Sequence, residues 1–248
     1  MKKILMINSA IFLAVGLAAV HLFAREIRFL HVTPRSASLS AAAGASVAYV
    51  FVHILPNLAE GQKTLMVTQF IPLGFAERHV YLIALIGFLT FYGLERSMFL
   101  VKNREMDPVQ FSQTPLPIFW MHITSFAMYN ALIGYLLLHQ EEPGTINRLF
   151  YFVAMGFHFL VNDHGLREHH KEIYDSVGRW ILAGSVILGW VAGLSIQSHQ
   201  AVVAVLFAFL AGSAIVNTLK EELPEGRESR FWAFALGAGI YSAILIAV

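Results

Sequence analysis

Long apolar stretches, separated by short polar segments, follow one another along the whole chain. A membrane-spanning helix needs about 20 mostly apolar residues. Eight stretches meet this requirement, at 4–24, 38–59, 79–101, 117–139, 148–166, 178–197, 201–220 and 231–248. Backbone groups cannot stay unpaired in lipid, and these runs are continuous, whereas the strands of a membrane β-barrel alternate apolar and polar residues. The pattern predicts an all-α, polytopic membrane protein with eight transmembrane helices and one transmembrane domain, residues 1–248.

The first stretch has two interpretations. Lys2 and Lys3, followed by an apolar run that ends at Ala24, are also typical of a cleavable signal peptide. The length of the run, and Arg25 and Arg28 directly after it, favour a retained helix. Both interpretations stay open at the level of the sequence.

The composition agrees with lipid as the outer solvent. Hydrophobic residues make up 57% of the chain and charged residues 13%, compared with about 25% charged in a soluble domain. The net charge of +1 gives no reason to expect nucleic acid as a partner. The chain has no cysteine, which excludes disulfides, thiolate metal sites and thiol catalysis. A metal site would therefore use His, Asn, Asp, Glu or backbone oxygen.

Lysine and arginine are divided unequally between the two sides that eight spans define. The side with both termini carries five of these residues and the other side carries twelve. Because positive loops stay in the cytoplasm, we expect both termini outside the cytoplasm, in the plasma (inner) membrane.

A faint internal repeat links the second and seventh spans. Gly44 follows a small residue, and Pro56 comes twelve residues later after a leucine. Gly212 and Pro224 repeat this arrangement in the seventh span. The two spans would run in opposite directions, which is typical of the inverted repeats of transporters. Small residues and Leu-Pro pairs are also frequent in membrane helices without any repeat, so both explanations stay open.

Several strongly polar residues lie deep in the predicted spans, where each costs about 2.5–3.5 kcal/mol on insertion scales. They are His53, Glu95, His122, Asn130, His158, Asn162 and Asp163. A rise of about 1.5 Å per residue places Asn130 and His158 near the middle of the bilayer. Asn162 shares a helix face with His158, and Asp163 lies beside it. Together they could hold a zinc-like divalent cation, or they could only form hydrogen bonds between helices.

A histidine-rich segment ends the fifth span. His164, His169 and His170 are similar to the histidine boxes of membrane di-iron oxygenases, which need several such boxes, whereas this chain has one. Three interpretations of this segment stay open: a solvated helix end, a patch that receives metal ions, and part of a metalloenzyme. For the protein as a whole, we expect no enzyme activity. Glu95 and Lys220 fit interfacial charges that extend toward water.

Three short motifs match a known family of membrane proteins. The second span ends in His53, Ile, Leu and Pro56, similar to a helix that ends in His-Leu-Leu-Pro. The seventh span runs from Gly212 to Leu-Pro-Glu225, and Glu95 ends the third span. In these features the chain resembles the ZIP family of divalent-metal transporters. The resemblance implies eight spans, both termini outside, and an inverted repeat that relates spans 1–3 to spans 6–8.

The two metal-binding motifs of this family are only partly kept. Its fourth helix carries His-Asn-x-x-Asp or Glu, which here becomes Phe126, Ala127 and Asn130. Its fifth helix carries two ligand positions that match His158 and Asn162, and only His158 is unchanged. Neutral oxygens bind a dehydrated dication more weakly than carboxylates do.

The resemblance implies transport of zinc or another divalent cation by alternating access. His158 would be the main ligand, Asn130, Asn162 and Asp163 would donate oxygen, and His53 would be a ligand or relay. The partners would be membrane lipids and the cation, with a homodimer as one assembly and no cofactor. The missing carboxylates favour an alternative, a ZIP-derived protein without metal transport that acts as a sensor, binding or scaffold partner.

Overall fold

The predicted apolar stretches form helices. In the computed structural model, residues 2–26, 36–68, 79–104, 116–139, 144–196, 199–222 and 230–247 are described, and within these ranges the chain is helical with short turns and has no strand. The α-helices are α1 (Lys2–Phe23), α2 (Ala37–Tyr49), α3 (Leu55–Thr68), α4 (His79–Arg104), α5 (Leu116–Leu136), α6 (Thr145–Ile173), α7 (Arg179–Ser195), α8 (Gln200–Glu222) and α9 (Phe231–Ile246). The all-α prediction is confirmed.

The second and fifth predicted spans are longer than the sequence suggested. A π-helical turn, η3 (Val50–Ile54), joins α2 to α3, so this rod continues to Thr68. A second π-helical turn, η5 (Tyr174–Gly178), follows α6 and leads into α7. A short 3₁₀ turn, η1 (Ala24–Glu26), follows α1. The polar residues in the extensions did not meet a hydropathy criterion, although the backbone stays helical there.

In the described part of the chain, five helical segments are long and apolar enough to cross a membrane. They are Ala37–Lys63, His79–Ser97, Leu116–Leu136, Tyr174–Ser195 and Gln200–Lys220. Ala10–Phe23 and Phe231–Ile246 are apolar but shorter. The helix α6 is long but carries the polar residues of the candidate site, which are buried in the protein and so do not meet lipid. The chain is therefore a multi-pass α-helical membrane protein.

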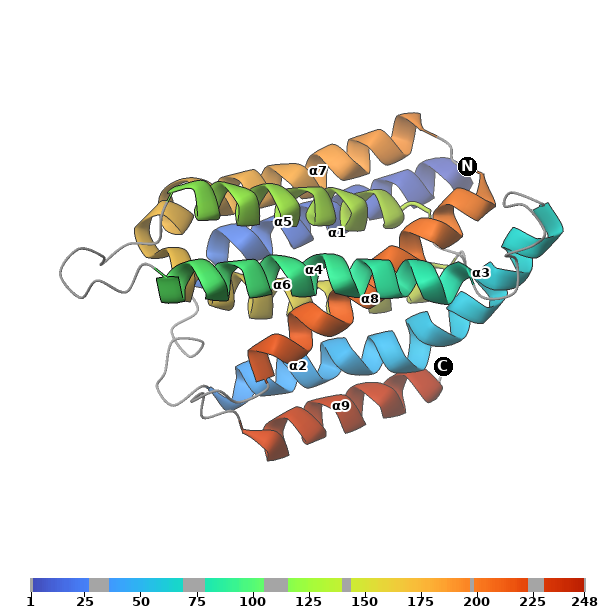
Figure 1. The fold of residues 1–248 in the computed structure, drawn as a ribbon. Helices are drawn as coiled ribbons and strands as arrows, with labels where there is room; N and C mark the ends of the chain where they lie inside the picture. The colour runs from blue at the N-terminus through green and yellow to red at the C-terminus, as the bar shows by residue number, and fades with distance from the viewer. Residues whose placement is uncertain are drawn as a thin grey trace.

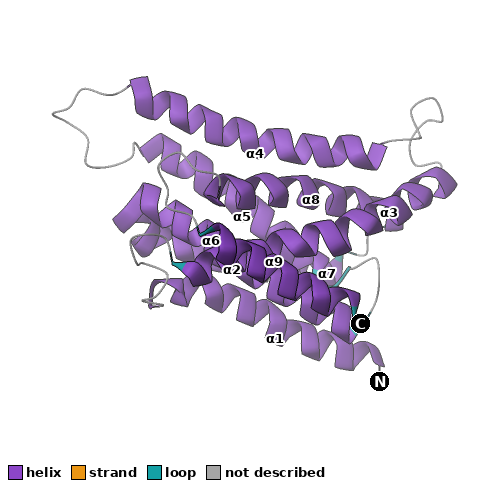
Figure 2. Ribbon diagram, turned by 90° about the horizontal axis from the view of Figure 1, so that it is seen from below, coloured by secondary structure: helices purple, strands orange, loops and turns teal. Residues whose placement is uncertain are grey.

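Successive helical rods run in alternating directions, as the colours of Figure 1 show. The two termini consequently lie at the same end of the bundle (Figure 1). Figure 2 shows α4 at one edge beside α8, with α1 at the opposite edge. The shared end of the termini agrees with the prediction that both lie on one side of a membrane.

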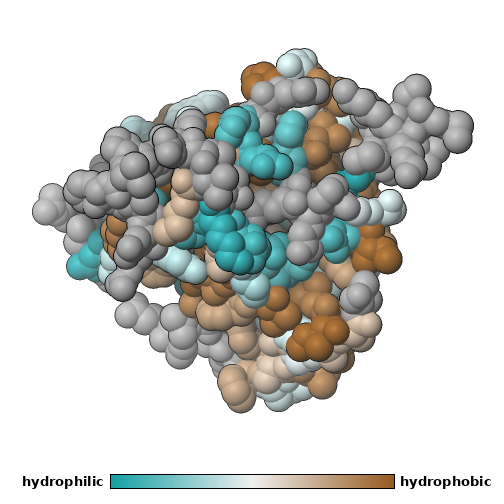
Figure 3. Space-filling model, turned by 90° about the vertical axis from the view of Figure 1, so that its right-hand side faces the viewer, coloured by the Kyte–Doolittle hydropathy of each residue, from teal (hydrophilic) through white to brown (hydrophobic). Residues whose placement is uncertain are grey.

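Large apolar side chains cover the outer surface of α4. Five of them, about half exposed, are Tyr81, Leu82, Leu85, Ile86 and Leu89. Figure 3 shows hydrophilic residues gathered on the end of the bundle that faces the viewer, and hydrophobic residues on its sides. A soluble protein rarely exposes so large an apolar surface, whereas lipid is its natural solvent.

Glycines hold three pairs of helices in close contact. On α4, an added Cβ at Gly87 would meet the carbonyl oxygen of Phe209 on α8, and one at Gly212 on α8 would meet that of Ala84 on α4. Two further pairs share this reciprocal arrangement, namely α2 with α9 through Gly44 and Gly237, and α5 with α7 through Gly134 and Gly189. Small residues allow backbones to approach closely in membranes, where packing replaces the hydrophobic effect. We call these three contacts the glycine seams.

Candidate functional site

A histidine and a carboxylate meet in the interior of the bundle. The Nδ1 of His21 on α1 lies 2.8 Å from Oδ1 and 3.0 Å from Oδ2 of Asp163 on α6, so this ring nitrogen donates to the carboxylate. The amide Nδ2 of Asn130 on α5 donates to Nε2 of the same ring over 2.9 Å. His21, Asn130 and Asp163 are all at least 98% buried. Three helices are thus joined by one chain of hydrogen bonds.

A second histidine extends this polar region toward α8. Nε2 of His158 accepts from Nδ2 of Asn162 at 2.9 Å and from the hydroxyl of Tyr129 at 3.1 Å. Its other nitrogen, Nδ1, donates to Oγ1 of Thr218 at 3.1 Å. His158 and His21 both contact the ring of Phe159, with centroids 6.5 Å and 4.3 Å away. We call these seven polar residues, His21, Tyr129, Asn130, His158, Asn162, Asp163 and Thr218, the central cluster.

Helical geometry explains why α6 supplies three members. His158 and Asn162 are four residues apart and Asp163 follows directly, so the three side chains share one side of the helix. Their side chains reach α1, α5 and α8, which all pack against α6 or against one another. His158 lies about 20 Å along α6 from its start, and Asn130 about 20 Å along α5 from its start at the opposite end. The central cluster therefore lies about midway through the bundle.

Some buried polar atoms on the helices that carry the cluster have no hydrogen bond. Oδ1 of Asn162 is one of them, and both side-chain polar atoms of Asn217 on α8 are others. Asn217 is 1% exposed and directly precedes Thr218. Leaving such a group unpaired costs about 1–3 kcal/mol, so proteins seldom tolerate it without a reason. Of these atoms, only Oδ1 of Asn162 belongs to a residue of the central cluster.

Four of the five predicted site residues belong to the central cluster. Asn130 and His158 were expected at a common depth. In the structure Asn130 donates to His21, and His158 accepts from Tyr129, the residue before Asn130 on α5. His53 is placed differently, in the π-helical turn η3. Its ring stacks on Tyr49 with centroids 4.9 Å apart, and Tyr49 lies 6.3 Å from Tyr151, two helical turns before His158. A ligand or relay role for His53 stays a prediction.

The sequence did not indicate His21, Tyr129, Thr218 or Asn217. His21 lies near the end of a stretch that could also be a signal peptide, and it was not among the deep polar residues named from the sequence. Tyr129 is one of many aromatic residues, which gave no reason to single it out. A histidine inside an apolar run is costly in lipid, and this was the one signal that could have identified His21.

The central cluster is a hydrogen-bonded network rather than an assembled metal centre. Among the described side chains, no group of three or more His, Asp or Glu residues is placed to hold a metal ion. Both nitrogens of each cluster histidine take part in hydrogen bonds. A cation would have to replace some of these bonds, which requires side chains or helices to move.

The charged and histidine-rich positions near the end of α6 have separate partners. His164 pairs with Glu168 at 3.3 Å, and His170 contacts His122 on α5. The side chain of His169 lies outside the described residues. The two described histidines of the predicted box thus have different partners.

Glu95 and Lys220, expected as interfacial charges, form an ion pair. Nζ of Lys220 lies 2.7 Å from Oε2 of Glu95 and 5.4 Å from the ring centroid of Phe126. A cationic side chain thus approaches the position at which the ZIP pattern has its first histidine. The pair joins α4 to α8 beside the central cluster.

No protein-family model matches the chain, and no curated protein or solved structure is significantly similar to it. The fold and the site therefore define a class by themselves: a multi-pass α-helical membrane protein with a buried polar cluster midway through the bundle. The resemblance to the ZIP family stays a prediction from three short motifs.

Proposed function

We propose that this protein is a membrane transporter that moves a zinc-like divalent metal cation through the central cluster by alternating access. The observation that carries the proposal is the buried meeting of His21, Asp163 and Asn130 midway through a lipid-facing bundle. Ionisable residues at such depth are costly and typically mark substrate or ion pathways. Substrate sites of transporters lie at this depth, between the repeated halves of the fold.

The glycine seams support the inverted repeat on which alternating access depends. Gly44 packs on the carbonyl of Phe234 and on Ala238, and Gly212 packs in the same way on Ala84 and Phe88. Spans 2 and 8 thus pair as spans 7 and 3 do, which is the relation that an exchange of spans 1–3 with spans 6–8 requires.

The reverse contacts of these two seams match as well. Gly237 packs on the carbonyl of Ala41, and Gly87 packs on that of Phe209. Ala41 and Phe209 each lie three residues before the glycine of their own helix, Gly44 and Gly212. The contact between α5 and α7 has the same three-residue offset, so the support for the repeat comes from which spans pair and not from the offset itself.

The chemistry of the cluster suits a borderline divalent ion. Imidazole favours zinc, copper, iron and nickel, and Asp163 supplies one negative charge. The unpaired oxygen of Asn162 adds a neutral donor. A single carboxylate and a network that must open favour brief, reversible binding over a tightly held ion, as transport requires.

The same hydrogen bonding favours a second candidate, a ZIP-derived membrane protein without transport that acts as a sensor, binding or scaffold partner. In that case the cluster would hold the helices together, as polar side chains do in many membrane bundles. Uptake measurements separate the two functions.

For the membrane orientation, we keep the arrangement that the loop charges predict, with both termini outside the cytoplasm in the plasma (inner) membrane. The common end of the two termini supports the even number of crossings that this arrangement requires. Because the natural chain has no cysteine, one cysteine at either end can be labelled directly to test its side.

Zinc uptake into proteoliposomes tests the proposed function. We expect the wild-type protein to raise uptake above that of protein-free vesicles, and His158→Ala to reduce it at least about tenfold, since His158 links α5, α6 and α8. His139→Ala is the matched control, because His139 stacks on Tyr135 at the end of α5, outside the cluster. Equal uptake by wild type and His158→Ala would show that the cluster is not the route.

A further inference from the structure

A second pair of buried histidines lies on the two helices that carry Asn130 and Asp163. Nδ1 of His122 on α5 and Nε2 of His170 on α6 are 3.2 Å apart. The two residues are 2% and 4% exposed. Both were seen in the sequence as separate polar positions, and the fold brings them together across the contact between α5 and α6.

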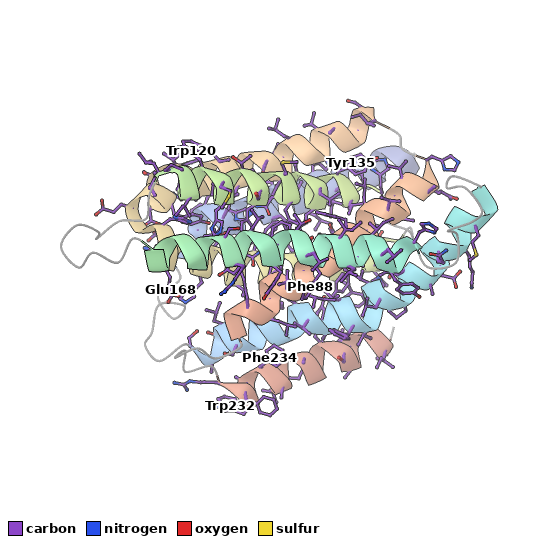
Figure 4. The ribbon with its side chains drawn as sticks, in the orientation of Figure 1. Phe88, Trp120, Tyr135, Glu168, Trp232 and Phe234 are labelled. Atoms are coloured by element: carbon purple, nitrogen blue, oxygen red, sulfur yellow. The ribbon has the colours of Figure 1, made fainter. Side chains whose placement is uncertain are left out.

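The pair is aligned with the central cluster. Asp163 and His170 are seven residues apart on α6, close to two full turns, so they share a face. His122 precedes Asn130 by eight residues on α5. The pair therefore lies about 10–12 Å from the cluster along the helix axes. Figure 4 shows Trp120 and Glu168, each two residues from one member of the pair, at the same end of the bundle.

Aromatic rings surround the pair. Phe119 lies 5.3 Å from the ring of His170, and Phe126 lies 6.2 Å from that of His122. Phe126 is also buried and stands four residues from both His122 and Asn130, between the pair and the cluster. These rings limit the positions of both imidazoles and separate the two polar sites in this conformation.

The spacing of the two nitrogens suits shared metal coordination. Zinc binds imidazole nitrogen at about 2.0–2.1 Å, so two nitrogens of a tetrahedral site lie about 3.3–3.4 Å apart. A hydrogen bond between the rings accounts for the same distance with no ion. Neutral imidazole selects zinc, cobalt, nickel or copper over magnesium and calcium, which prefer oxygen ligands.

We propose that His122 and His170 form a second cation site, at which a borderline divalent metal ion binds through two imidazole nitrogens and retains water on its other positions. Its use as a station between the central cluster and the adjacent end of the bundle rests on the proposed function. Binding itself does not, because the two imidazoles coordinate an ion whether or not the protein transports it.

Cobalt binding to purified protein in detergent tests this site, with equilibrium dialysis for stoichiometry and the absorption of the bound ion for nitrogen coordination. We expect His122→Gln and His170→Gln each to remove one bound equivalent or to weaken it at least about tenfold. Glutamine can still hydrogen-bond to the remaining histidine, so the helix contact is preserved. His139→Gln, outside both sites, is expected to bind as the wild type does.

The possible outcomes separate this inference from the proposed function. Unchanged cobalt binding and absorption in folded His122→Gln and His170→Gln would overturn the second site, since the histidines would then only be hydrogen-bonded. Loss of one bound equivalent in both variants, with the wild-type stoichiometry retained in His139→Gln, supports it. Absence of zinc uptake by wild-type proteoliposomes would refute transport and leave the cobalt result standing.

Discussion

Replacement of Asp163 by asparagine is expected to reduce zinc uptake by at least about 100-fold while the protein remains folded. Asp163 is the one carboxylate in the central cluster, and its oxygens lie 2.8 and 3.0 Å from His21. Asparagine keeps the size of the side chain and an oxygen that can accept from Nδ1 of His21. It removes only the negative charge that offsets the cost of taking a dication out of water.

The size of this effect follows from electrostatics. Two unit charges 4 Å apart interact with about 4 kcal/mol at an effective dielectric constant of 20, and a divalent ion doubles this. The variant also avoids the cost of taking a carboxylate out of water, which offsets part of this loss. A weakening of cation binding of at least about 2.7 kcal/mol, or 100-fold, remains. Initial rates of zinc uptake at several concentrations measure it.

The matched control for this substitution is Asp175→Asn. Asp175 pairs with Arg167 at 3.0 Å near the end of α6 and does not belong to the cluster. We expect its uptake to stay within about twofold of the wild type, since interactions of partly exposed ion pairs are weak. Comparable losses in the two variants would mean that general destabilisation, and not the cluster charge, controls uptake.

Substitution of Gly87 by leucine is expected to destabilise the bundle by about 3 kcal/mol. Its Cβ would meet the carbonyl of Phe209 on α8, so the helices α4 and α8 would have to separate. Overpacking usually costs about 1–3 kcal/mol, and a backbone that cannot yield puts this site at the upper end. Unfolding by increasing denaturing detergent, followed by circular dichroism, measures the loss.

The same helix provides the control. An added Cβ at Gly93 on α4 would meet nothing within 4 Å, so Gly93→Leu should change stability by less than about 1 kcal/mol. On α9, Gly237→Leu and Gly239→Leu form an equivalent pair, with Gly237 packed on Ala41 and Gly239 open. If the inverted repeat is correct, Gly87→Leu and Gly237→Leu have similar effects. A loss confined to one of the two seams would contradict the repeat.

The helices were predictable because hydropathy is a local property. The helix α4 begins at His79, the residue at which its predicted stretch begins, and α9 begins at Phe231 in the same way. The apolar pattern placed the end of α5 at residue 139, three residues after Leu136. It also missed the polar residues that continue a helix, beyond residue 59 in α3 and after residue 166 in α6. Those residues are helical because the preceding turns have already nucleated the helix, and each further residue extends it cooperatively. A hydropathy average over the local sequence does not include this effect.

The central cluster was only partly predictable for a different reason. His158, Asn162 and Asp163 lie on one helix, so their common face follows from their spacing. The approach of His21 on α1 and Thr218 on α8 depends on which helices pack together, and sequence spacing carries no information on that. Gly44 and Gly212 were visible as a repeat, whereas their contacts with Phe234 and Ala84 required the fold.

Anomalous scattering from crystals grown with zinc tests the central claim most directly, that the buried cluster between α1, α5, α6 and α8 takes a divalent cation. A peak at the zinc edge within coordination distance of Asp163 and of His21 or His158 is the expected result. Zinc bound only at other positions, with the hydrogen bond between His21 and Asp163 intact, would contradict the account.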